Sequence, residues 1–362
     1  MFNKILMTVF GLVVVASIWS VTLAEAGEII SRVQVVLVPN EGKVPDAEID
    51  GTGTIHLAYF SDSNVYYIKS SDDGRSFSPP IRVNSEDGFA YGGAYRGPDL
   101  ALGTGGNIHI IWYNAAYQQN RPTEHWGVMY SRLEKGSSVF EASRNLNRKP
   151  SDNFSLAADG TGRVAVIWMA GSIYANLSAN EGETFSAPLN LNTDPCECCG
   201  SQAVYTPDGR LAVLYRDKAE NYRDTYLSLL PREGKDFTSL KISQTPWYIT
   251  SCPMTGSSLK LAGSDLIAGW ETQGRIYFDQ LILDGQLVSM IETHVTDSGR
   301  YPVVLKAWDG KTLVSWKDGF KLKWQMFNSE KEKEEQIKSV ACLAVDRPSG
   351  VVTRDGRFLL FP

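Results

Sequence analysis

The sequence predicts an all-β protein, a β-propeller of six blades with seven blades as the alternative. Composition is the first observation behind this prediction: the 362 residues include 32 Gly, 16 Pro, 9 Trp, 16 Tyr and 14 Phe. Aromatic residues favour strands, and Gly and Pro favour the tight turns that join them. The second observation is a repeat of 46 to 56 residues that runs along most of the chain, which is the length expected of a blade of about four short strands.

Each repeat contains a short apolar strand, a Gly-containing turn and a second strand that ends in an aromatic residue. The six aromatic residues are Tyr59, Trp112, Trp168, Tyr215, Trp270 and Trp316. Turns such as Asp50-Gly51 and Asp159-Gly160 supply the positive φ that tight hairpins need.

Six full repeats run from about residue 44 to residue 340, and a partial seventh follows at residues 351–361. An open ring would leave unpaired strand edges, so we expect residues 32–38 to pair with this last segment. Six blades plus a closing segment is the preferred count.

The first 26 residues predict a signal peptide. Lys4 precedes an apolar run over residues 5–21, and Ala24-Glu25-Ala26 matches the small-residue pattern of a cleavage site. The alternative is an uncleaved membrane anchor. We expect an exported protein, periplasmic or secreted, whose residues 27–362 form one propeller domain with no membrane segment of its own. The net charge of −6 argues against nucleic acid as a partner, since a sequence-independent binder needs a basic face.

A second motif occurs twice, in the frame Ser-x-Asp-x-Gly-x-x-Phe. The first copy consists of Ser70, Asp72, Gly74 and Phe77, and the second of Ser178, Asn180, Gly182 and Phe185. In such a motif the short polar side chain caps backbone amides of the turn, and the aromatic packs beneath it. The chain resembles the sialidase-like propeller superfamily, whose Asp-box or BNR repeat has this frame, and in particular uncharacterised secreted members with a Cys-x-Cys-Cys segment. The resemblance implies the fold and places the Asp-boxes away from the functional site.

The resemblance to this superfamily does not extend to the substrate-binding site of the sialidases. Sialidases of the superfamily hold the substrate carboxylate with three arginines, and the first of these belongs to an Arg-Ile-Pro motif. Here the corresponding place reads Lys43-Val44-Pro45, without an arginine. Arg300-Tyr301 matches only part of such a site, so fold analogy does not license the activity.

Segments that lead into the innermost strands, and loops between the second and third strands, gather at one face of a propeller. The ligand-binding candidates at that face are Arg96, Arg216, Arg223 and Arg300. The weaker catalytic candidates are Asp217, Asp224, Glu271 and Tyr301. Two Tyr-Arg-Asp triplets, residues 215–217 and 222–224, either bind a sugar acid, supply a general acid and base, or pair with each other to fix their loop.

Four of the five cysteines belong to two consecutive leading segments: Cys196, Cys198, Cys199 and Cys252. Three interpretations stay open. Cys252 forms a disulfide with one of the other three, as an oxidising compartment favours; the four thiolates bind Cu(I) or Zn; or two of them form a redox dithiol. Cys342 is expected to be a buried bystander in a strand.

The sequence therefore predicts an exported propeller that binds an anionic or glycan ligand at its channel mouth. We expect a binding or scaffold protein without true sialidase activity, with a glycan, an anionic small molecule or another protein as its partner. A glycan-active enzyme, either a glycoside hydrolase or a polysaccharide lyase, is the first alternative. A periplasmic protein that binds Cu or Zn through thiolates is the second.

Overall fold

The computed structural model describes residues 31–362 except 94–95, 193, 234–235, 285, 290 and 343–345. The predicted signal peptide, residues 1–26, lies outside the described residues. Residues Arg32–Pro362 form one compact unit. In the described part of the chain, no helix has the length and apolar character needed to cross a bilayer.

The described strands form seven sheets. The first contains β2 (Lys43–Ile49), β3 (Ile55–Ser61), β4 (Asn64–Ser70) and β5 (Ile81–Arg82). The second contains β6 (Ala90–Tyr91), β7 (Asp99–Leu102), β8 (Ile108–Asn114), β9 (Val128–Leu133) and β10 (Arg144–Asn145). The third contains β11 (Asp152–Ala158), β12 (Val164–Met169), β13 (Ile173–Ser178) and β14 (Leu189–Asn192). The fourth contains β15 (Gln202–Tyr205), β16 (Leu211–Arg216), β17 (Thr225–Leu230) and β18 (Thr238–Lys241).

The fifth sheet contains β19 (Ser258–Ala262), β20 (Asp265–Thr272), β21 (Arg275–Asp284), β22 (Gln286–Ser289) and β23 (Thr293–Thr296). The sixth contains β24 (Arg300–Lys306), β25 (Thr312–Asp318), β26 (Lys321–Phe327) and β27 (Lys338–Ala341). The seventh contains β28 (Ser349–Val352), β29 (Phe358–Phe361) and β1 (Val33–Val35). Short 3₁₀ turns lie at Pro39–Glu41, Thr104–Gly106 and Thr123–His125.

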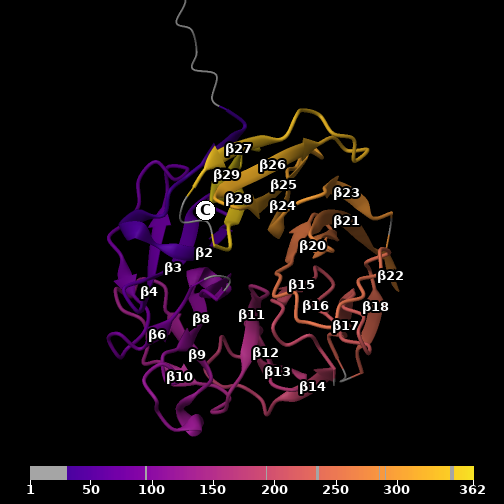
Figure 1. The fold of residues 1–362 in the computed structure, drawn as a ribbon. Coiled ribbons are helices and arrows are strands. Elements are labelled where there is room, and N and C mark those ends of the chain that lie inside the picture. Colours follow the sequence, from indigo (N-terminus) through magenta and orange to yellow (C-terminus); the bar gives the residue numbers. More distant parts are fainter. Residues whose placement is uncertain are drawn as a thin grey trace, which may run out of the picture. The chain divides into compact units, whose positions relative to one another are not determined.

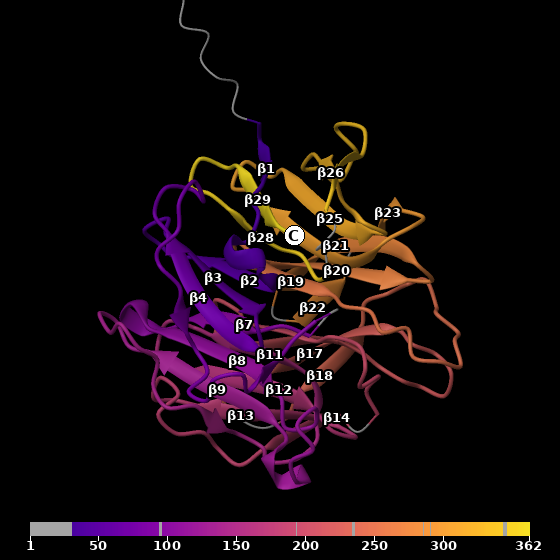
Figure 2. The same cartoon turned by 60° about the vertical axis from the view of Figure 1, so that its left-hand side comes forward.

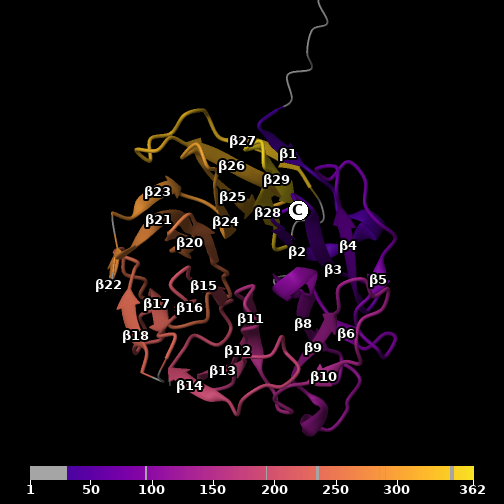
Figure 3. The same cartoon turned by 180° about the vertical axis from the view of Figure 1, so that it is seen from behind.

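The sheets are the blades of a propeller, arranged in a ring in chain order (Figure 1 and, from behind, Figure 3). Each innermost strand contacts the innermost strand of the next blade, and β28 contacts β2. This last contact closes the ring, so the predicted all-β propeller is confirmed.

The blade count is seven, where six was the preferred prediction. The last segment does not complete another blade, because β28, β29 and β1 form a sheet of their own. Strand β1 runs parallel to β29, with Val33 opposite Phe358, and the Val36 N–H donates to the Leu360 carbonyl at 2.8 Å. Figure 2 shows β1 beside β29. The predicted pairing of residues 32–38 with the last segment is thus confirmed for residues 32–36.

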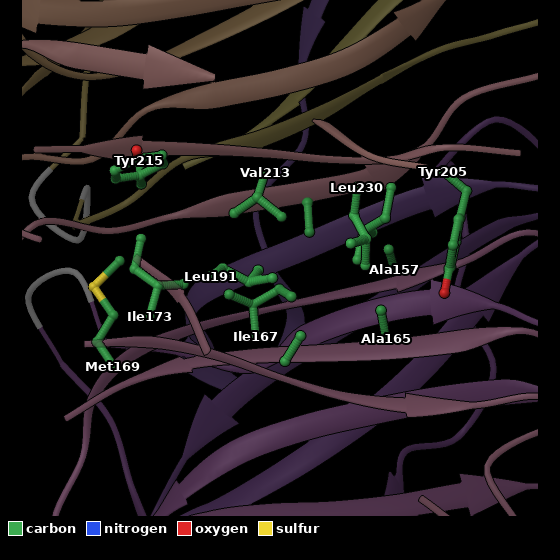
Figure 4. Packing of buried hydrophobic residues seen from close by; sticks show 13 residues of the cluster. Ala157, Ala165, Ile167, Met169, Ile173, Leu191, Tyr205, Val213, Tyr215 and Leu230 are labelled. Carbon is green, nitrogen blue, oxygen red and sulfur yellow. The ribbon is translucent and has the colours of Figure 1, made fainter. Parts of the chain in front are cut away.

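The core lies between neighbouring blades. All six repeat aromatics are buried, with no more than 1% of each side chain exposed. Between the third and fourth blades, Ile167 and Ala157 pack with Val213 and Leu230 (Figure 4). The aromatic repeat is therefore a packing repeat, in which each aromatic side chain belongs to a hydrophobic cluster of the core.

The two faces of the ring carry different kinds of loop. The strands within each of the first six blades pair antiparallel, so the turns from first to second strand and from third to fourth strand share one face. Both Asp-boxes follow a third strand, β4 or β13, and lie at that face. The segments that lead into the innermost strands, together with the loops from second to third strand, lie at the opposite face, which we call the mouth.

The Asp-boxes have the local role that the sequence predicts. The Ser70 hydroxyl oxygen accepts the Gly74 N–H, and the Ser178 hydroxyl oxygen accepts the Gly182 N–H, both at 2.9 Å. Gly74 and Gly182 have φ values of 77° and 70°, which side chains with a Cβ rarely adopt.

Candidate functional site

A pocket of about 370 Å³ opens at the mouth, over the second and third blades. Four of its lining residues are aromatic: Tyr91, Tyr113, Tyr117 and Trp126. Tyr91 ends β6 and Tyr113 is the penultimate residue of β8, whereas Tyr117 and Trp126 belong to the loop between β8 and β9. An aromatic-lined hollow of this size is typical of small-ligand sites.

Tyr117 and Trp126 form the outer wall of this aromatic pocket. Their rings meet edge to face, with centroids 4.8 Å apart, and Tyr117 is 64% exposed. The Trp126 indole N–H donates to the Arg121 carbonyl at 3.0 Å, which fixes the orientation of the ring. The wall thus presents ordered apolar faces to solvent.

Three charged residues line the aromatic pocket: Arg96, Asp152 and Glu197. Arg96 forms an ion pair with Asp152, and its guanidinium lies 5.6 Å from the centre of the Tyr113 ring. Asp152 starts β11 at a β-bulge, where the next residue, Asn153, has a φ of 34°. The Asn153 amide donates to the Glu197 carbonyl, which ties the bulge to the cysteine segment.

Sequence analysis placed Arg96 at the mouth but missed the aromatic pocket. A sequence signal for this pocket does exist: aromatic residues stand at positions 113, 117 and 126, around the end of β8 and in a loop that is otherwise mostly polar. Glu197, which lies between Cys196 and Cys198 in the sequence, also lines the pocket and is not among the predicted site residues.

Arg216 and Arg223 lie beneath the surface of the mouth and are 3% and 6% exposed. Arg216 ends β16; its guanidinium donates to the carbonyls of Arg223 and Glu271 and lies 4.8 Å from the centre of the Trp247 ring. Arg223 donates to the carbonyls of Glu220 and Tyr222 at 2.9 and 3.1 Å. These two cations hold backbone segments together.

The carboxylates of the two triplets bond to other groups than these arginines. Asp224 accepts from the Lys241 ammonium at 2.6 Å and from the Trp247 N–H at 3.0 Å. Asp217 accepts from the Asn192 amide at 3.3 Å, and burial raises the pKa of its carboxyl. Mutual ion pairs within the two triplets were one of the predicted alternatives. Arg216 and Arg223 instead donate to backbone carbonyls.

Glu271 is the penultimate residue of β20, lies close to the cysteines and is 2% exposed. The Thr255 hydroxyl donates to its carboxylate at 2.6 Å, and the Arg300 Nε lies 4.0 Å away. Burial raises the pKa of Glu271, and the bond from Thr255 and the two nearby arginines offset only part of this effect.

Arg300 and Tyr301 start β24 at a second bulge, where Tyr301 has a φ of 52°. Arg300 donates to the Pro253 carbonyl at 2.9 Å, and the Tyr301 hydroxyl donates to the Met254 carbonyl at 3.2 Å. Both side chains thus brace the segment that carries Cys252.

Four sulfurs gather beside Glu271 and Arg216, and all lie within 4.8 Å of one another. Cys198 and Cys252 form a disulfide with a Cα–Cα distance of 6.5 Å, so Cys252 pairs with one of the trio as the disulfide interpretation predicts. Cys196 and Cys199 are buried thiols whose sulfurs are 3.4 Å apart. Cys342 is buried in another cluster, directly after β27 and not within a strand.

Cys196 and Cys199 differ strongly in acidity. Burial alone would raise the pKa of Cys199, but the bond from the Cys196 thiol, the charge of Arg216 and a backbone bond from Thr255 lower it to about 7. The pKa of Cys196 is raised, because its S–H group donates a hydrogen bond to the Cys199 sulfur and because the thiol is buried. A proton shared between the two sulfurs thus resides on Cys196.

The four cysteines could hold a metal ion once all of them are thiols. With the Cys198–Cys252 disulfide formed, two thiol donors remain, whereas a closed tetrahedral zinc site takes four protein ligands. The disulfide state therefore does not fit such a site.

Comparisons with known proteins agree with this architecture at the level of the fold. No protein-family model matches the chain, and no curated protein matches it. Among solved structures, a polysaccharide lyase, ulvan lyase, superposes with a TM-score of 0.57 at 12% identity, covering 88% of this chain and 91% of the lyase. The NanB sialidase from Streptococcus pneumoniae superposes with a TM-score of 0.50 at 10% identity, covering 84% of this chain and 69% of the sialidase.

The fold is an all-β, seven-bladed β-propeller that is structurally similar to the sialidases. A third similar structure is the SapL1 lectin in complex with alpha methyl fucoside, with a TM-score of 0.50 at 11% identity, covering 84% of this chain and 96% of the lectin. The sialidase, the lyase and the lectin resemble this fold and have different activities, so the activity of this propeller has to be argued from its own residues.

Proposed function

We propose that this protein binds a glycan in the aromatic pocket at its mouth. The observation that carries the proposal is the combination of four aromatic rings with Arg96, Asp152 and Glu197 around one hollow. Aromatic faces bury the apolar face of a sugar ring, and charged side chains make strong hydrogen bonds to its hydroxyls. The similar structures include a lectin bound to a fucoside, which supports a sugar as the ligand.

The charge of the aromatic pocket favours a neutral glycan over an anionic one. Arg96 is already paired with Asp152, and Glu197 adds a second carboxylate to the lining. The carboxylate of a sialic or uronic acid would therefore face a net negative wall. Arg216 and Arg223, which the sequence analysis assigned to an anion, donate instead to backbone carbonyls.

Binding, and not cleavage, is the activity that these residues support. A glycosidase uses two carboxyl groups on either side of the bond that it breaks. Asp152 is held by Arg96, Asp224 by Lys241, and Glu271 is buried under Thr255. A glycan-active enzyme is the alternative, because Asp152 and Glu197 do line one pocket.

The test is calorimetric titration with neutral and acidic oligosaccharides. We expect Trp126→Ala and Tyr117→Ala each to weaken binding of the neutral glycan about tenfold, which corresponds to about 1.4 kcal/mol of lost stacking. Trp308→Ala is the matched control, because Trp308 is 77% exposed and lies between β24 and β25, at the face opposite the mouth.

Equal affinity in Trp126→Ala and Trp308→Ala would refute the aromatic pocket as the binding site. The same mixtures are then analysed for new reducing ends and for the ultraviolet absorbance of an unsaturated uronic acid. Glycan breakdown that Glu197→Gln abolishes would replace the binding function with a hydrolase or lyase.

A further inference from the structure

The four clustered cysteines differ in exposure in an ordered way. Cys252 is exposed, Cys198 is half-buried, and Cys196 and Cys199 are buried. The Cys196 sulfur lies 3.8 Å from the Cys198 sulfur and 3.4 Å from the Cys199 sulfur. Cys196 thus contacts both the disulfide and the other free thiol.

Cys196 and Cys199 also have the spacing of a redox dithiol. The run Cys196-Glu197-Cys198-Cys199 contains a Cys-x-x-Cys pair that its Cys-x-Cys-Cys appearance conceals. The backbone N–H of Cys199 donates to the Cys196 carbonyl at 2.9 Å, so a tight turn brings the two side chains together. The Cys196 N–H donates to the Arg216 carbonyl at 2.9 Å, which anchors this turn to β16.

We propose that these cysteines form a thiol–disulfide exchange centre, in which one disulfide moves between an outer pair, Cys198 and Cys252, and an inner pair, Cys196 and Cys199. The exposed end of the outer pair is where a low-molecular-weight thiol or disulfide from solution reacts. The protein then contains one disulfide in either arrangement, and its oxidation state is the same in both.

The exchange proceeds in two steps that need no outside oxidant. In the first step Cys196 passes its proton to Cys199, and the Cys196 sulfur forms a bond to Cys198. The Cys198–Cys252 bond breaks, and Cys252 leaves as a thiolate that takes a proton from water. In the second step Cys199 loses its proton to solvent and forms a bond to Cys196, and Cys198 leaves as a thiolate and is protonated. One disulfide and two thiols are present before and after.

The surroundings suit this chemistry. The Cys199 sulfur lies 3.4 Å from the Cys196 sulfur and is the nearby acceptor for its proton. Arg216, held by two backbone carbonyls, favours the thiolate form of Cys199 before the exchange, so this acceptor is available. Arg300 and Tyr301 hold the Cys252 segment through the carbonyls of Pro253 and Met254. Release of Cys252 therefore leaves its segment attached and in reach for the return step.

Peptide mapping tests the proposal on the folded wild-type protein. The protein is equilibrated in glutathione buffers, quenched with acid, alkylated and digested with trypsin. The outer disulfide links the tryptic peptides 164–210 and 242–260, whereas the inner disulfide closes a loop within 164–210 and leaves Cys252 alkylated. We expect both isomers in wild type, with an unchanged total of free thiols.

Three variants separate the steps. Cys196→Ser removes the first attacking sulfur, so the inner isomer disappears and the outer disulfide remains. Cys199→Ser stops the exchange at a Cys196–Cys198 bond with Cys252 free. Cys342→Ser is the matched control and leaves the isomer ratio of wild type, because Cys342 lies in a different cluster.

Two results would overturn the proposal. One is that peptides 164–210 and 242–260 stay linked in every folded wild-type sample, with Cys196 and Cys199 recovered as thiols; this result needs no variant to fold. The other is that the reduced protein takes up one Zn²⁺ or Cu(I) per chain and then forms neither disulfide, which would make the cluster a metal centre. Glycan binding is measured separately, so its failure would not affect either outcome.

Discussion

At the scale of single residues, His109 shows how burial controls protonation in the blades. Its ring is fully buried and is hydrogen-bonded to the Tyr130 hydroxyl at 2.8 Å and to the Glu181 carboxylate at 3.2 Å. His56 makes the corresponding bonds to Tyr67 and Asp50 in the first blade. The two histidines occupy equivalent strand positions and are packing residues, as their sequence positions indicate.

We expect the free energy of unfolding to fall between pH 6.5 and about pH 4 because of His109. Burial lowers the pKa of His109 from 6.5 to about 4, against the opposing charge of Glu181. In this window the unfolded chain binds the proton and the folded chain does not, so acid favours unfolding, by about 3 kcal/mol at the lower end. Urea unfolding at pH 7 and pH 4.5 should show a smaller loss for His109→Gln than for wild type. The exposed His125→Gln is the control, and equal losses in all three proteins would contradict the assignment.

Single residues at the mouth were the least predictable part of the chain. The sequence placed Arg216 and Arg223 correctly near the mouth, but their charge suggested a ligand where the structure has backbone carbonyls. A local sequence does not report which long-range carbonyl lies within reach of a guanidinium. Cys198 and Cys252 were grouped correctly by topology, although only the fold selects Cys198 as the partner of Cys252.

At the scale of elements, the turn of the first Asp-box is held by bonds within its own hairpin. Ser70 also donates to the Asp72 carboxylate at 2.7 Å, and this carboxylate accepts the Ser76 N–H at 2.9 Å. Hydrogen bonds from Ser76 and Ser70 lower the pKa of Asp72 to about 2. All these bonds join residues within one hairpin, which is why the motif could be recognised from the sequence alone.

Ser70→Ala and Ser178→Ala should each reduce the free energy of unfolding by about 1–2 kcal/mol. Each change leaves a buried glycine N–H, of Gly74 or Gly182, without its acceptor. Because the hairpins lie at the face opposite the mouth, glycan affinity and the cysteine isomer ratio should stay as in wild type. Thermal or urea unfolding measures the first effect, and Ser138→Ala, at an exposed loop position, is the control. A change in affinity with unchanged stability would contradict a purely local role.

At the scale of the whole molecule, β1 completes the blade that closes the ring. The parallel pairing of Val33–Val35 with β29 supplies the third strand of the seventh blade. The sequence predicts this pairing but gives a seventh blade only as the alternative, because the last repeat supplies two strands of its own, β28 and β29, where the other six supply at least four. Pairing across more than 300 residues leaves no local pattern, so only the demand for a closed ring predicts it.

Val36→Pro should destabilise the protein by about 1–3 kcal/mol more than Val36→Ala. Both variants lose part of a side chain that packs against Phe361 and Leu359, but only proline removes the N–H that donates to Leu360. Urea unfolding followed by tryptophan fluorescence compares the two. Equal stabilities would show that closure rests on side-chain packing and not on the backbone pairing of the first and last strands.

The same closure fixes the order in which the molecule can be completed during synthesis. The segment Val33–Val35 is among the first described residues to be made, and its partner Phe358–Phe361 is among the last. Until β28 and β29 have been made, β1 has no partner strand and β2 lacks its contact with the seventh blade. The growing chain therefore carries two open edges up to that point, and β28 and β29 then convert a row of blades into a ring.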